Sequence, residues 1–161
     1  MGNLSPTSQK FPSILLILLI FLISFFPFAT SDTQNILQRS SFLSVEDDSD
    51  YITSPDKSFN CSFYGMGENA YWFSIWFTNS KERTVVWMAN RNRPVNGRGS
   101  RISLQQDGAM ILRECWWLPV WETNTTSTDV DRAELLDTGN LVLKDPRGKI
   151  LWQSFHFPTD I

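Results

Sequence analysis

The sequence contains a segment that repeats itself after 31 positions. One copy runs from Gly108 to Trp121, and the other runs from Gly139 to Trp152. A period of roughly 20–50 residues is typical of structural units that bury their apolar faces against one another. Within each copy, apolar and polar residues alternate around a glycine turn, which indicates a β-hairpin and not a pair of helices. The repeat therefore predicts an all-β fold assembled from similar hairpins around one core.

Short strands separated by turn residues are expected along most of the chain, and no helical periodicity of useful length occurs after residue 31. The breaks within each group of strands are short, which favours antiparallel hairpins. The strands are expected at 58–63, 71–77 and 84–89, at 101–104, 109–113 and 120–122, and at 133–136, 141–144 and 150–153. The acidic stretch 32–50 is interpreted as a solvated entry strand and turn, because no glycine-bearing loop spaces its carboxylates around a calcium ion.

The beginning of the chain has the pattern of a secretory signal peptide. Lys10 is the only charge before the apolar run 14–26, and the small residues Ala29 and Ser31 follow that run. An uncleaved anchor is the alternative, but the run is shorter than the roughly 20 apolar residues that a comfortable membrane span needs. We therefore expect residues 1–31 to be a signal peptide. Residues 32–161 are then a secreted, extracellular domain without a membrane span, with its core at about 42–156.

Charge and motif content argue against several functional classes. The net charge of −3 argues against nucleic-acid binding, which depends on clustered Lys and Arg. The one basic cluster, between Arg91 and Arg101, is interpreted as a solvated loop. His156 is the only histidine, which excludes a two-histidine metal site, and the sequence has no G-x-S-x-G, V-A-I-K or H-R-D motif. We expect no enzyme activity, no cofactor and no metal.

Two cysteines and two sequons bear on a secreted chain. Cys61 and Cys115 would meet an oxidising compartment, where a disulfide between them and two separate thiols are both open, the second being favoured. The sequons N-C-S and N-T-T predict N-glycosylation at Asn60 and Asn124. Asn60 alternates with the strand face that carries Cys61, so its side chain is expected to point to solvent.

Tryptophan is frequent near the ends of the expected strands. Trp76, Trp87, Trp121 and Trp152 have two interpretations, a stacking platform for sugar and a shared aromatic core at the centre of three sheets. The core is favoured, because buried aromatic side chains dominate core energetics.

Three long motifs resemble one known family. They are T-V-V-W-M-A-N-R at 84–91, L-L-D-T-G-N-L-V-L at 135–143, and L-W-Q-S-F-x-x-P-T-D at 151–160. In this order they closely resemble the bulb-type lectin domain of plant S-domain receptor-like serine/threonine kinases. The resemblance implies a β-prism II fold, with three antiparallel four-stranded sheets around a pseudo-threefold axis. Without a kinase region, the chain resembles the lectin ectodomain alone, or a receptor truncated after it.

The family's mannose motif, Q-x-D-x-N-x-V-x-Y, is only partly retained. The resemblance implies sugar-binding roles for Gln105, Asp107 and Ile111 in one repeat, and for Asn140 and Val142 in the next. The remaining motif positions carry Ala109, Arg113, Leu136, Thr138 and Lys144, and the first repeat has no recognisable copy. Each lost hydrogen bond forfeits about 1 kcal/mol of affinity.

The second hairpin also departs from the family, because 114–119 reads E-C-W-W-L-P and lacks the turn glycine. Trp116 and Trp117 at this tip form either a contact patch or a weakness of the hairpin.

Two functions follow from these observations. The chain is a secreted carbohydrate-binding module for mannose-type glycans, or it is a protein-binding or decoy ectodomain that associates with a receptor-like kinase ectodomain.

Overall fold

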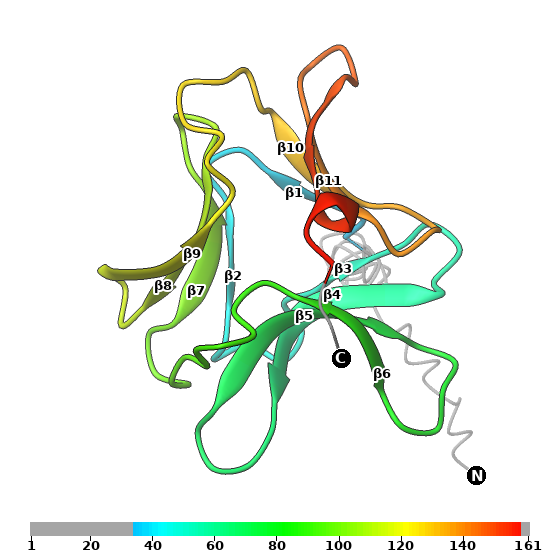
Figure 1. The fold of residues 1–161 in the computed structure, drawn as a ribbon, viewed down its shortest axis with the longest axis vertical. Coiled ribbons are helices and arrows are strands. Elements are labelled where there is room, and N and C mark those ends of the chain that lie inside the picture. The colour runs from blue at the N-terminus through cyan, green and yellow to red at the C-terminus, as the bar shows by residue number, and fades with distance from the viewer. Residues whose placement is uncertain (1–33, 159–161) are drawn as a thin grey trace, which may run out of the picture. The chain divides into compact units, whose positions relative to one another are not determined.

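A computed structural model describes residues 34–158, and the expected signal peptide lies outside them. This part of the chain folds into three antiparallel four-stranded sheets (Figure 1). Sheet I contains β1 (Ile36–Gln38), β10 (Arg132–Leu135), β11 (Leu141–Lys144) and β12 (Ile150–Gln153). Sheet II contains β2 (Phe42–Ser44), β7 (Arg101–Leu104), β8 (Met110–Glu114) and β9 (Leu118–Glu122). Sheet III contains β3 (Ile52–Thr53), β4 (Phe59–Gly65), β5 (Tyr71–Phe77) and β6 (Thr84–Met88). A short 3₁₀ turn, η1 (Ser154–His156), follows β12. The predicted fold class is confirmed, and the nine expected strands lie where the sequence places them, to within about two residues at each end.

The interpretation of residues 32–50 as a solvated entry strand and turn was wrong, because the described part of this stretch contains two strands, and Leu37 and Leu43 in them are fully buried. The N-terminal segment instead supplies one edge strand to each sheet, β1 to sheet I, β2 to sheet II and β3 to sheet III. Each of these strands has two or three residues and buries an apolar side chain completely, namely Leu37, Leu43 and Ile52. Strands this short show no alternation that a sequence pattern could reveal.

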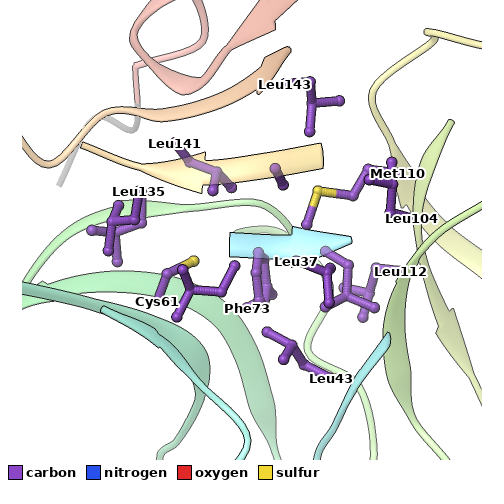
Figure 2. Close-up of a cluster of buried hydrophobic side chains, with 14 of the residues drawn as sticks. Leu37, Leu43, Cys61, Phe73, Leu104, Met110, Leu112, Leu135, Leu141 and Leu143 are labelled. Atoms are coloured by element: carbon purple, nitrogen blue, oxygen red, sulfur yellow. The ribbon is translucent and has the colours of Figure 1, made fainter. Parts of the chain in front are cut away.

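The core lies between the sheets and is built from one face of each. Figure 2 shows Leu37 near the middle of the cluster, with Phe73 and Cys61 of sheet III on one side and Leu112 of sheet II on another. Leu141 of sheet I approaches from the remaining side. No sheet buries its apolar face alone, as the sequence repeat predicts.

Three tryptophans, one from the last strand of each sheet, meet edge to face. The ring centroids of Trp87 and Trp121 are 5.8 Å apart, those of Trp121 and Trp152 are 5.7 Å apart, and those of Trp87 and Trp152 are 6.1 Å apart. The expected aromatic core is therefore confirmed for these three residues. The Phe157 ring stacks on Trp152, and the Phe157 carbonyl oxygen accepts a hydrogen bond from Trp87 Nε1 at 2.9 Å. The segment after β12 therefore covers the three tryptophans.

The third strand of every sheet is capped in the same way. A side chain just beyond the fourth strand accepts a backbone N–H near the start of the third. Asn90 Oδ1 accepts from Phe73 at 2.8 Å, Thr123 Oγ1 from Met110 at 3.0 Å, and Ser154 Oγ from Leu141 at 3.0 Å. All three capping residues are buried. In β5, β8 and β11 alike, the pairing with the fourth strand also shifts register, immediately after the residue that lies two positions beyond the capped one. These shared features place Phe73, Met110 and Leu141 at equivalent positions.

The two cysteines are free thiols and form no disulfide with each other. Cys61 points from β4 into the core and is fully buried, which raises the pKa of its thiol well above the ordinary value. Cys115 is exposed at the tip of the β8–β9 hairpin in another sheet. Within residues 34–158, no helix has the length and apolarity that crossing a bilayer would require.

Candidate functional site: the outer faces of the three sheets

The family's sugar motif lies on the sheet faces that point away from the core. The side chains of the capped residues Phe73, Met110 and Leu141 point inward. The side chains immediately before and after each of them therefore point outward. The outer positions are Ala109 and Ile111 in sheet II, and Asn140 and Val142 in sheet I. The equivalent pair in sheet III, which the sequence motif did not reveal, is Trp72 and Ser74.

Sheet II presents two polar motif residues at the turn before β8. Asp107 is exposed and Gln105 is half-buried. Asp107 Oδ1 accepts the Ala109 N–H at 3.1 Å, while the Gln105 amide donates to Ser103 Oγ. Gly108 has φ +90°, and a Cβ there would approach the Thr128 carbonyl oxygen to 2.7 Å, so this turn requires glycine. The turn thereby places a carboxylate and an amide beside each other at the surface.

The rest of the sheet II motif is apolar or altered. Ala109 is fully buried and offers no hydrogen-bonding group, and Ile111 is 9% exposed. Arg113, at the position of the family's tyrosine, pairs with Arg101 across the β7–β8 ladder and is half-buried. This face offers Gln105, Asp107 and Arg113 to a polar ligand.

In sheet I the retained asparagine is engaged within the fold. Asn140 is 6% exposed, and its Nδ2 donates to Gln153 Oε1 at 2.9 Å. Its Oδ1 accepts the Ser154 hydroxyl at 3.1 Å and the Phe155 N–H at 3.3 Å. Val142 is fully buried. These hydrogen bonds of Asn140 fix the turn that follows β12.

An ion-paired cluster covers the neighbouring part of the sheet I face. Glu134 on β10 accepts hydrogen bonds from Arg132 Nε at 2.7 Å and from Lys144 Nζ. Burial raises the pKa of Glu134, but the bonds from Lys144 and Arg132 outweigh that effect, so the pKa lies below its ordinary value. Lys144, at the position of the family's tyrosine, is thus directed to a carboxylate of its own chain.

Sheet III has a hollow on its outer face, with a volume of about 500 Å³. Its lining includes Tyr51, Asn60, Ser62, Trp76, Thr78 and Arg83. The expectation that Trp76 joins the central core was wrong. Its ring lies 6.3 Å from Tyr64, and the Arg83 guanidinium lies 5.4 Å from the ring centroid. Trp76 faces outward because it is three residues after the inward-pointing Phe73 in an extended strand, on the opposite face.

The β8–β9 hairpin tip is an exposed apolar feature. Trp116 is 63% exposed and Trp117 is 73% exposed. Cys115 and Trp116 have φ of +50° and +76°, so two non-glycine residues adopt the left-handed conformation that the missing glycine would supply. Arg101 lies between Trp116 and the exposed ring of Phe42, at 5.6 and 5.1 Å from their centroids. Arg101 is the first residue of β7, in agreement with the strand that the sequence predicts at 101–104.

Comparisons with known proteins identify the family. Residues 84–161 match the family model described as D-mannose binding lectin. Among curated proteins, the receptor-like serine/threonine-protein kinase SD1-7 of Arabidopsis thaliana is 36% identical over 91% of the chain. The putative receptor protein kinase ZmPK1 of Zea mays is 41% identical over 89% of the chain. The chain spans only 17% and 18% of the lengths of these two relatives.

Solved structures give the same fold at low sequence identity. A monomeric monocot mannose-binding lectin from Gastrodia elata matches with a TM-score of 0.57 and 16% identity, over 78% of this chain and 100% of its own. A lectin from Marasmius oreades matches with a TM-score of 0.55 and 18% identity, over 76% of this chain and 92% of its own. These structures show a β-prism fold, and together with the family model they identify a bulb-type lectin domain. The chain belongs with the lectin domains of the plant S-domain, or G-type lectin, receptor-like kinases.

Proposed function

We propose that residues 32–161, secreted after removal of a signal peptide at 1–31, form an extracellular domain that recognises mannose-type glycans on the outer face of sheet II. The observation that carries this proposal is the pair of polar side chains at the turn before β8. Asp107 is exposed and Gln105 is half-buried, whereas Asn140 in sheet I is buried, and both its Nδ2 and its Oδ1 are hydrogen-bonded within its own chain. The name of the Gastrodia elata lectin, a mannose-binding protein of the same fold, supports the ligand class.

The chemistry of this face suits weak binding. Carboxylate and amide groups form directional hydrogen bonds with sugar hydroxyls, and a hydrogen bond to a charged group contributes about 1.5–3 kcal/mol. Arg113 has donors where the family's tyrosine has a hydroxyl, and Ile111 provides an apolar surface for ring carbons. Ala109 offers no contact in place of asparagine. The proposal assigns binding to this face and no catalysis.

Asp107→Ala tests the proposal. We expect it to weaken mannose binding about tenfold or more, because the charged acceptor is removed from an exposed turn. Isothermal titration calorimetry or a glycan array measures the change. Thr138→Ala is the matched control, because Thr138 is the exposed counterpart of Asp107 in sheet I. Equal binding by the parent and Asp107→Ala would remove the proposed site.

Protein binding is the second candidate function, and the exposed indoles of Trp116 and Trp117 favour it. Exposed apolar clusters often mark interfaces. In this case the domain acts as a recognition or decoy ectodomain that associates with the ectodomain of a receptor-like kinase.

Replacing both Trp116 and Trp117 with Ser distinguishes this function from a simple weakness of the hairpin. If the tip is an interface, the double variant stops co-purifying with a receptor-like kinase ectodomain, and free mannose does not compete with the parent's association. If the variant gains solubility and still co-purifies, the tip is no interface. Ile150→Ser serves as a control, since Ile150 is an exposed apolar residue on β12 in sheet I.

A further inference from the structure

The side chain of Asn60 lines the hollow on the outer face of sheet III. It lies on β4 opposite Trp76 of β5, and the next residue, Cys61, points into the core and is fully buried. The amide of Asn60 makes no hydrogen bond with any residue in 34–158. Asn60 is half-buried, so its side chain reaches the surface through a recess.

Two adjoining recesses meet at this residue. The hollow of about 500 Å³ and a smaller one of about 180 Å³ both include Tyr51, Asn60 and Thr78 in their linings. The larger hollow falls within the range of about 300–1,000 Å³ that is typical of small-molecule sites. A group attached to the Asn60 amide therefore starts inside a recess that has room for sugar rings.

The walls of the hollow have the chemistry that a saccharide requires. Tyr51 and the aliphatic stem of Arg83, whose guanidinium lies over the buried Trp76 ring, offer apolar surface to the C–H face of a pyranose ring. The exposed carboxylates of Asp47 and Asp48 offer acceptors to hydroxyl groups.

We propose that the first sugars of an N-glycan on Asn60 lie in this hollow and stabilise sheet III, so that the chain's own glycan covers this face. The inference rests on the proposed secretion, because the sequon at 60–62 is modified only in the secretory pathway. Sheet II is then the sheet face left open to an external ligand.

Asn124 provides an internal comparison. It also belongs to a sequon, but it is exposed on the loop after β9, with φ +52°. A glycan attached there extends into solvent and has no reason to stabilise the fold.

The experiment compares the full chain, secreted from a glycosylating host, with its Asn60→Gln and Asn124→Gln variants. Glycopeptide mass spectrometry first establishes the occupancy of both sequons. We expect Asn60→Gln to lower Tm by about 3–5 °C, the change that corresponds to roughly 1 kcal/mol for a domain of this size, and Asn124→Gln to leave Tm unchanged. We also expect an endoglycosidase to release the Asn60 glycan from the native protein about fivefold more slowly than the Asn124 glycan.

Two controls separate the glycan from the amide. In protein made without glycans, Asn60→Gln should leave Tm unchanged. Arg83→Ala should remove most of the Tm difference between the glycosylated parent and Asn60→Gln, because it removes a wall of the hollow.

Equal Tm values and equal release rates at the two sites would overturn the inference while leaving secretion intact. An occupied Asn124 beside an unmodified Asn60 would also overturn it. If the chain is secreted and neither sequon is occupied, the inference fails alone, whereas retention of the chain inside the cell would contradict the proposed secretion. Binding of free N-acetylglucosamine in the hollow of the glycosylated protein would show an open ligand site instead and would likewise overturn it.

Discussion

Replacing Trp152 with Ala is expected to lower the free energy of unfolding by about 3–5 kcal/mol. Trp152 is 7% exposed and contacts Trp87, Trp121 and Phe157 through its ring. Its removal leaves a cavity where the last strands of all three sheets meet. Edge-to-face aromatic pairs also contribute about 0.5–1.5 kcal/mol beyond the area they bury. The loss is a large part of the 5–15 kcal/mol that stabilises an ordinary domain.

Trp117→Ala is the matched control for that experiment. It removes the same side chain from a position that is 73% exposed, so we expect a change within about 0.5 kcal/mol. Urea denaturation followed by far-ultraviolet circular dichroism measures both variants, because tryptophan fluorescence itself changes with the substitution. A Trp152→Ala protein as stable as Trp117→Ala would show that the three indoles do not hold the sheets together.

Replacing Leu37 with Ala is expected to lower the free energy of unfolding by about 2–5 kcal/mol. Leu37 is fully buried, and β1 pairs with β10, with Leu37 opposite Ala133. Because the side chain lies near the middle of the shared core, its removal weakens the contacts between sheets as well as within sheet I (Figure 2).

Ile36→Ala is the neighbouring control, and we expect it to cost less than about 1 kcal/mol because Ile36 is half-buried on the other face of the same strand. Hydrogen exchange of the β10 amides provides a second measurement, since loss of β1 exposes one edge of that strand. If Leu37→Ala and Ile36→Ala unfold alike, the N-terminal strand is a surface addition and not part of the core.

The three sheets share a backbone plan but differ on their outer faces. Equivalent side-chain caps and register shifts occur in β5, β8 and β11. On the outside, sheet I has an ion-paired Glu134, sheet II has Gln105 and Asp107, and sheet III has a hollow beside Asn60 and Trp76. The inner faces are constrained by a common core, whereas each outer face meets only solvent or a ligand and can change without disturbing the others.

The sequence alone determined the repeating hairpins, because alternation and glycine turns are local properties of the chain. Gly108 and Gly139, 31 positions apart, both have positive φ, and the strands around them lie where the pattern predicts. The third copy escaped detection because its capped residue, Phe73, precedes Met110 by 37 positions, and its outer face carries Trp72, Ser74 and Trp76 in place of the motif.

The tertiary structure decided which of these residues are available for function. Asn140 matches the sugar motif in sequence, yet it is bonded to Gln153, Ser154 and Phe155, which follow it by more than a dozen positions. Trp76 looks like the other core tryptophans in sequence, yet it faces outward beside Arg83. The strands β1, β2 and β3 are too short to show a period, and they form because each completes a sheet that the rest of the chain has built. Local alternation specifies where strands form, whereas hydrogen bonds and burial between distant segments decide which side chains remain free to bind a ligand.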